Sequence, residues 1–183
     1  FSLLERAARS KLPIVLSTGM CDLVDVSNAV RTCEEAGNLD VTLMQCGSVY
    51  PLPPEQANLR VMEVFRGAFG GPVGFSDHTL GHAASLAAVA RGAAVVEKHF
   101  TLDKKAKGPD HFYALEPAEL KKFVDGLREV HLALGGTEKS LLPDERKYGR
   151  REGLFAKEDL KAGMVLTEML VELKRPALGI RAR

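Results

Sequence analysis

Residues 73–110 read VGFSDHTLGHAASLAAVARGAAVVEKHFTLDKKAKGPD, and this stretch decides the fold of the chain. Two short apolar runs, residues 73–75 and 93–96, each lead into a histidine. The alanine-rich segment between them ends at Gly92 and is typical of a helix. Together they predict a strand–helix–strand unit, whose two strands run parallel because such a pair requires a crossover connection.

The two histidines, His78 and His99, follow the two predicted strands at their carboxyl ends. Parallel strands present equivalent ends on one side, so both imidazoles should emerge at the same edge of the sheet. Such a pair suits a divalent transition metal, although it does not select which one. The alternative is that they are unrelated polar residues, since loops after strands are polar in any case. The pattern alone leaves both interpretations open.

Two further apolar runs, residues 12–16 and 41–46, read as strands buried on both faces. With them, strand starts near Ile14, Val41, Val73 and Ala94 follow one another at intervals of 27, 32 and 21 residues. This spacing is typical of successive βα units and predicts a parallel sheet. Besides the alanine-rich segment, the apolar periodicity predicts helices over about residues 22–37, 55–69 and 117–134.

The chain changes character after this α/β part. The charged segment 137–151 reads as an irregular linker. From Gly153 onward, short alternating stretches, including residues 164–166 and 170–173, predict a separate small β-rich element.

Composition excludes several classes of protein. The 183 residues, 45% of them hydrophobic, can bury one sizeable core. A net charge of +1 gives no reason to expect nucleic acid or a membrane surface as a partner. No apolar run has the length of a membrane span, and no signal peptide is evident. The three cysteines form no C-x-x-C pair, so we expect reduced thiols in a cytoplasmic protein.

Five motifs, in this order along the chain, resemble the sialic acid synthase family. They are STGM at 17–20, YPLPPE at 50–55, SDHT at 76–79, EKHFTLD at 97–103, and GPDH at 108–111 followed closely by ALEP. The segment FAKEDLKAGMVLTEMLVELKRP, residues 155–176, resembles the start of the antifreeze-like (SAF) domain that follows the barrel in this family.

The resemblance implies a fold of the (β/α)8 TIM-barrel type. Such a barrel has eight strands and typically about 250 residues, whereas only four βα units can be counted here. We therefore expect residues 1–136 to form the C-terminal half of a barrel, residues 137–152 a linker, and residues 153–183 the N-terminal part of a SAF domain. The chain alone should be incomplete and inactive.

The resemblance also implies a reaction. Family members are transferases that condense phosphoenolpyruvate with an N-acetylated amino sugar, such as N-acetylmannosamine, to a nonulosonic acid. They use a divalent metal, which we expect to be Mn2+, with Mg2+ and Co2+ as alternatives. We expect the full-length protein to be a homodimer.

Residues of the family's metal and phosphate sites map onto matching positions here. His78 and His99 correspond to the metal ligands. Ser17 and Ser76 correspond to residues that contact the phosphate, although each serine could instead cap a helix. Ser48 stands where relatives carry Asn or Ser beside the enol substrate.

The sugar site maps in the same way. Tyr50 corresponds to a tyrosine that lines it, Asp110 to an aspartate that hydrogen-bonds sugar hydroxyls, and Arg175 to an arginine that reaches the N-acetyl group across a dimer. The alternatives are a packing role for the tyrosine, a solvated loop position for Asp110 and a solvated basic residue at position 175. Because side chains alternate along a strand, Glu97 should point into the barrel together with His99. There it could support a metal ligand or form a core ion pair.

Other functions remain open on sequence alone. Parity points Lys98 toward the helices, which argues against a Schiff-base aldolase. The family's catalytic lysines come from the first half of the barrel. The chain could therefore be a non-catalytic half-barrel that needs a partner chain, or part of a synthase for legionaminic acid, pseudaminic acid or spore-coat polysaccharide. A metal-dependent hydrolase is weaker, because no third strong ligand is evident.

Overall fold

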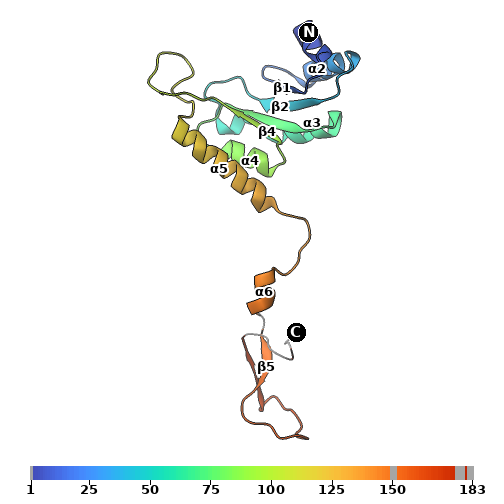
Figure 1. The fold of residues 1–183 in the computed structure, drawn as a ribbon, viewed down its shortest axis with the longest axis vertical. Coiled ribbons are helices and arrows are strands. Elements are labelled where there is room, and N and C mark those ends of the chain that lie inside the picture. The colour runs from blue at the N-terminus through green and yellow to red at the C-terminus, as the bar shows by residue number, and fades with distance from the viewer. Residues whose placement is uncertain (1, 149–151, 176–179, 181–183) are drawn as a thin grey trace. The chain divides into compact units, whose positions relative to one another are not determined.

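The structure of this chain is a computed structural model that describes residues 2–148, 152–175 and 180 (Figure 1). Two compact units make up the chain, Phe1–Gly135 and Gly136–Arg183. The first is an α/β unit with a parallel sheet, and the second contains a short helix and a strand pair.

Helices and strands alternate through the first unit. They are α1 (Ser2–Arg9), β1 (Ile14–Ser17), α2 (Leu23–Glu35), β2 (Val41–Cys46), the 3-10 helix η1 (Pro54–Gln56), α3 (Val61–Phe69), β3 (Val73–Asp77), α4 (Ala83–Ala90), β4 (Val95–Lys98) and α5 (Pro117–Leu134). The four predicted strands are confirmed. The helix expected from Glu55 begins only at Val61, because Asn58 has a φ of 47° that an α-helix cannot contain.

The four strands lie in chain order, β1-β2-β3-β4, and every neighbouring pair is parallel. Each crossover therefore advances in the same direction, whereas a doubly wound sheet would reverse its strand order. The helices α2, α3 and α4 all contribute to one apolar cluster against the sheet. A curled parallel sheet with its helices on one face is half of a TIM-type barrel.

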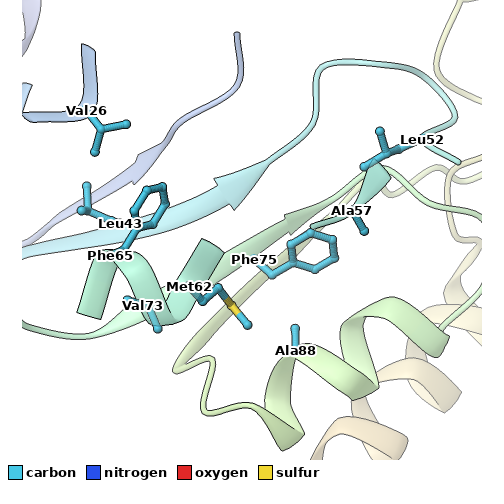
Figure 2. Packing of buried hydrophobic residues seen from close by; sticks show 9 residues of the cluster. All are labelled: Val26, Leu43, Leu52, Ala57, Met62, Phe65, Val73, Phe75 and Ala88. Carbon is cyan, nitrogen blue, oxygen red and sulfur yellow. The ribbon is translucent and has the colours of Figure 1, made fainter. Parts of the chain in front are cut away.

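The core lies between this sheet and its helices. Val73 and Phe75 of β3 lie near Met62 of α3 and Ala88 of α4, and Leu43 of β2 belongs to the same cluster, as Figure 2 shows. All five are almost completely buried, and burial of each large side chain stabilises the fold by about 1.5–3 kcal/mol. Alternation along the strands leaves the opposite sheet face for the chemistry.

The second unit contains α6 (Pro143–Tyr148) and an antiparallel pair, β5 (Gly153–Ala156) with β6 (Val171–Lys174). The irregular linker expected over residues 137–151 thus contains a helix. The small β element is present, but within described residues 152–175 the stretch 164–166 forms no strand. That this unit begins a SAF domain stays a prediction.

Across the described part of the chain, no helix is both long and apolar enough to cross a bilayer.

The half-barrel predicts self-association of the isolated chain. Both β1 and β4 are edge strands of the four-stranded sheet, and such edges offer unpaired N–H and C=O groups. On the face away from the core, Val15 is 51% exposed. Light scattering after size exclusion should therefore find dimers or larger assemblies at micromolar concentration.

The matched control is the completed barrel, meaning this chain together with the remaining barrel strands, supplied on a longer polypeptide or as a second chain. It should elute as a defined species. A stable monomer of the isolated chain would contradict the expectation.

Candidate functional site

The strand register brings the predicted site residues onto one face of the sheet. Cys46 lies beside Ser76, and Ser76 beside Glu97, so these three side chains share the inner face. The Ser76 hydroxyl donates a hydrogen bond of 2.7 Å to Oε1 of Glu97. Two residues further along β3 and β4 come His78 and His99, just past the strand ends.

A buried ion pair lies on the opposite, helix-facing side, as parity predicted for Lys98. Its Nζ is 2.9 Å from Oδ2 of Asp77, and the two side chains are only 4% and 0% exposed. Ser85 of α4 donates to the same carboxylate, the backbone N–H of Thr79 donates to its other oxygen, and Lys98 also donates to the Thr79 carbonyl. This network fixes the ends of β3 and β4 against α4.

The imidazole of His78 is held in one orientation. The ring is almost completely buried, and its Nδ1 lies 2.7 Å from the carbonyl oxygen of Gly47. A carbonyl only accepts, so Nδ1 carries the hydrogen and Nε2 presents its lone pair. That is the tautomer a metal-binding histidine needs.

His99 is close to His78 and is held by a side chain. The ring centroids are 5.2 Å apart, and Nδ1 of His99 lies 3.2 Å from the Tyr113 hydroxyl. That hydroxyl is also 2.7 Å from Oδ1 of Asp110. Burial and the neighbouring His78 lower the pKa of His99, which favours the neutral imidazole. Burial and Asp110 raise the pKa of Tyr113.

The two imidazoles can act as ligands of one divalent ion. For metal–nitrogen bonds of about 2.1 Å, centroids of two rings on one ion lie roughly 4.5–6.5 Å apart, which includes the observed separation. Within the described residues, no group of three or more His, Cys, Asp or Glu is arranged to hold a metal. The pair would therefore supply only part of a coordination shell.

Tyr50 completes an aromatic group around the histidines. Its ring centroid lies 4.3 Å from that of His78, 5.8 Å from that of His99 and 6.1 Å from that of Tyr113. Tyr50 is 47% exposed, so it stands at the rim with its ring tilted against both imidazoles.

The loops after β1 and β2 meet closely. A Cβ on Gly19 would lie 2.2 Å from Oγ of Ser48, so a larger residue at this position would force the Ser48 hydroxyl to move. The Cys46 thiol lies between Ser48, Ser76 and the Gly19 backbone, and burial raises its pKa, which keeps it a thiol near neutral pH. Ser17, at the end of β1, is exposed.

Two backbone hydrogen bonds join the two ends of the loop after β4. Leu115 donates to the carbonyl of His99 at 2.9 Å and accepts from the N–H of Thr101 at 3.0 Å. Within the loop, the Thr101 hydroxyl lies 2.7 Å from Nδ1 of His111, which places that histidine in a structural role. This loop carries Asp110 and brings Tyr113 back to His99.

Contacts thus link most of the predicted site residues. They join Ser76 to Glu97, Tyr50 to both histidines, and His99 through Tyr113 to Asp110. Arg175 belongs to the second unit, where its guanidinium lies 3.9 Å from Oε1 of Glu152 and both side chains are exposed. Sequence reasoning missed Cys46, Tyr113 and the Asp77–Lys98 pair.

Comparison with known proteins gives consistent matches. The NeuB family model matches residues 1–139. An uncharacterized protein of Methanocaldococcus jannaschii is 42% identical over 100% of this chain and 55% of its own length. The N,N'-diacetyllegionaminic acid synthase of Campylobacter jejuni is 43% identical over 98% of this chain and 55% of its own length.

Solved structures agree. A spore coat polysaccharide biosynthesis protein from Bacillus subtilis superposes with a TM-score of 0.68 at 33% identity, covering 98% of this chain and 53% of that one. An N-acetylneuraminic acid synthetase from Leptospira borgpetersenii gives 0.73 at 33% identity, over 80% and 51%. The chain spans about half the length of the curated relatives that it matches.

The buried ion pair should be essential for stability. In the completed barrel, Lys98→Met should lower the free energy of unfolding by about 3–5 kcal/mol, because it leaves the Asp77 carboxylate buried without a counter-charge. Chemical denaturation followed by circular dichroism measures this. Adding Asp77→Asn should restore part of the loss.

The matched control is Lys121→Met, which removes a lysine from an exposed pair with Asp125 on α5. It should change the free energy of unfolding by less than about 1 kcal/mol. Equal effects of the two lysine variants would show that burial of the Asp77–Lys98 pair does not matter.

Proposed function

The chain belongs to the NeuB family of sialic acid synthases, and from that membership we propose that the completed barrel condenses phosphoenolpyruvate with an N-acetylated amino sugar. The product would be a nonulosonic acid. The observation that carries the proposal is the pairing of His78 and His99, since each ring has an oxygen within hydrogen-bond distance of Nδ1, which would leave the lone pair on Nε2.

The histidines would hold a divalent metal through their Nε2 atoms. We take Mn2+ as the working choice, with Mg2+ and Co2+ as alternatives, because imidazole ligands alone do not select among them. When bound, the metal supplies a Lewis acid for the aldehyde oxygen of the sugar. Its remaining ligands would come from substrate oxygens, from water or from the remaining strands.

The hydroxyl groups of the inner face suit the phosphate and enol of phosphoenolpyruvate. Ser17 ends β1, and Ser48 follows β2 and lies against Gly19, so these hydroxyls and the backbone donors of the two loops could be shared by an anion. The Ser76 hydroxyl donates its hydrogen to Glu97, so it would donate to the phosphate only after exchanging that bond for one to the substrate.

Charge balance requires the other half of the barrel. The described strands β1–β4 contain one lysine and no arginine, and that lysine, Lys98, faces the helices. A substrate with phosphate and carboxylate groups needs compensating cations, which the remaining strands would provide. This is why we propose that the isolated chain is inactive.

The sugar would lie against Tyr50 and Asp110. The tyrosine ring offers an apolar face at the rim, and the carboxylate accepts hydrogen bonds from sugar hydroxyls. Arg175 would contact the N-acetyl group from the SAF domain of a homodimer partner. We propose the acceptor only as a class, because a legionaminic acid synthase and a mouse N-acetylneuraminate-9-phosphate synthase match at 43% and 42% identity.

The completed barrel should form a sugar acid from phosphoenolpyruvate and at least one N-acetylated amino sugar when Mn2+ is present. Mass spectrometry over a panel of such sugars identifies the product. The His78→Ala, His99→Ala double variant should lose activity and bind no Mn2+ at this site. The control is His131→Ala, an exposed histidine of α5, which should leave both unchanged.

Activity of the isolated chain would contradict the need for the remaining strands. Retained Mn2+-dependent activity in the double histidine variant would remove the proposed metal site. A completed barrel that folds but forms no product with any sugar of the panel would favour the non-catalytic alternative.

Ser17→Ala should raise the KM for phosphoenolpyruvate about tenfold to a hundredfold, because a hydrogen bond to a charged group contributes about 1.5–3 kcal/mol. The KM for the sugar should change much less. Steady-state kinetics with each substrate varied in turn separates the two. Ser27→Ala, an exposed serine within α2, is the matched control. Equal increases in both KM values would indicate a structural role for Ser17.

A further inference from the structure

Tyr113 connects two residues of the proposed site. Its hydroxyl lies 3.2 Å from Nδ1 of His99 and 2.7 Å from Oδ1 of Asp110. The side chain is only 4% exposed, so this hydroxyl has little access to bulk water.

The direction of the hydrogens follows from the chemistry of the three groups. An ionised carboxylate only accepts, so the Tyr113 hydroxyl donates its hydrogen to Asp110. The oxygen lone pair then faces His99 and can accept a hydrogen only from Nδ1. His99 therefore carries its hydrogen on Nδ1 and presents a lone pair at Nε2. Disturbing this arrangement costs more in a buried site than in water.

The two histidines differ in what holds them. A backbone carbonyl, that of Gly47, fixes the tautomer of His78. For His99, Tyr113 is the one side chain that bonds the ring in the described part of the chain. The tautomer of His99 therefore depends on a single hydroxyl that a substitution can remove.

We propose that Tyr113 is the positioning residue of the site: its hydroxyl holds His99 in the tautomer that binds metal and holds the Asp110 carboxylate toward the sugar. The inference rests on the proposed function for its metal and sugar. It adds a coupling, because loss of one hydroxyl should affect the metal ligand and the sugar-binding carboxylate together.

The variant Tyr113→Phe isolates this hydroxyl. The ring makes its own contacts, with centroids 5.1 Å from His99 and 6.1 Å from Tyr50, and phenylalanine keeps them. A change in the variant therefore reports the hydrogen bonds and not lost packing.

The first measurement needs no metal and no substrate. In the metal-free completed barrel, 15N chemical shifts should show His99 protonated at Nδ1 and unprotonated at Nε2. In Tyr113→Phe, the His99 shifts should move toward a mixture of the two tautomers. His78 is the internal control, since its partner is a backbone carbonyl, and its shifts should stay the same.

The second measurement is Mn2+ affinity, followed by electron paramagnetic resonance of the free ion without substrates. Tyr113→Phe should weaken binding about 10- to 100-fold, the usual effect of removing the partner of a metal-binding histidine. The KM for the sugar should rise while that for phosphoenolpyruvate changes little. The matched control is Thr101→Val. It removes the Thr101 hydroxyl, which lies in the same loop but bonds His111.

Three outcomes would overturn the inference. Unchanged His99 shifts in Tyr113→Phe would show that the hydroxyl does not set the tautomer. Unchanged Mn2+ affinity despite shifted tautomers would show that the tautomer does not matter for metal binding. An equal loss in Thr101→Val would assign the effect to loop structure. If the wild-type protein itself binds no Mn2+, the proposed metal site fails, which is a different result from any of these.

Discussion

The contact on which the site depends is the buried pair between Asp77 and Lys98. These residues are register partners on β3 and β4, and each directly precedes a histidine of the site. Because alternation sends neighbouring residues to opposite faces, an ion pair on the helix side aligns the two imidazoles on the inner side. Burying this ion pair is costly unless its remaining hydrogen-bonding groups find partners. Ser85 and the backbone of Thr79 supply these partners. Residues that stabilise the fold thus alternate with residues of the site at the ends of β3 and β4.

The strands and the loops contribute different residues to the site. Strand register sets where His78 and Glu97 emerge, while the long loop after β4 supplies Asp110 and Tyr113. Rigid strands fix positions along the rim, and loops add groups that the strands cannot provide. The site therefore has a part that the fold determines and a part that is specific to the loop.

Much of this could be predicted from the sequence. Apolar runs that end in polar residues identified all four strands, and parity placed Lys98 on the helix side. The sequence could not reveal Tyr113, because its partner His99 is reached only when a loop folds back on itself. The ion pair was missed because it requires the register of β3 and β4. Of the two stretches expected in the small β-rich element, residues 170–173 overlap β6, whereas residues 164–166 form no strand.

The fastening of the loop after β4 has a consequence for affinity. Backbone hydrogen bonds at Leu115 close the loop. Lys104 adds contacts to Glu116, which caps the helix that follows, and to Glu119 within that helix. Ordering Asp110 costs conformational entropy, and this cost arises during folding and not on ligand binding. A ligand that reaches this carboxylate meets a preorganised acceptor, and little of its binding free energy is spent on ordering the protein.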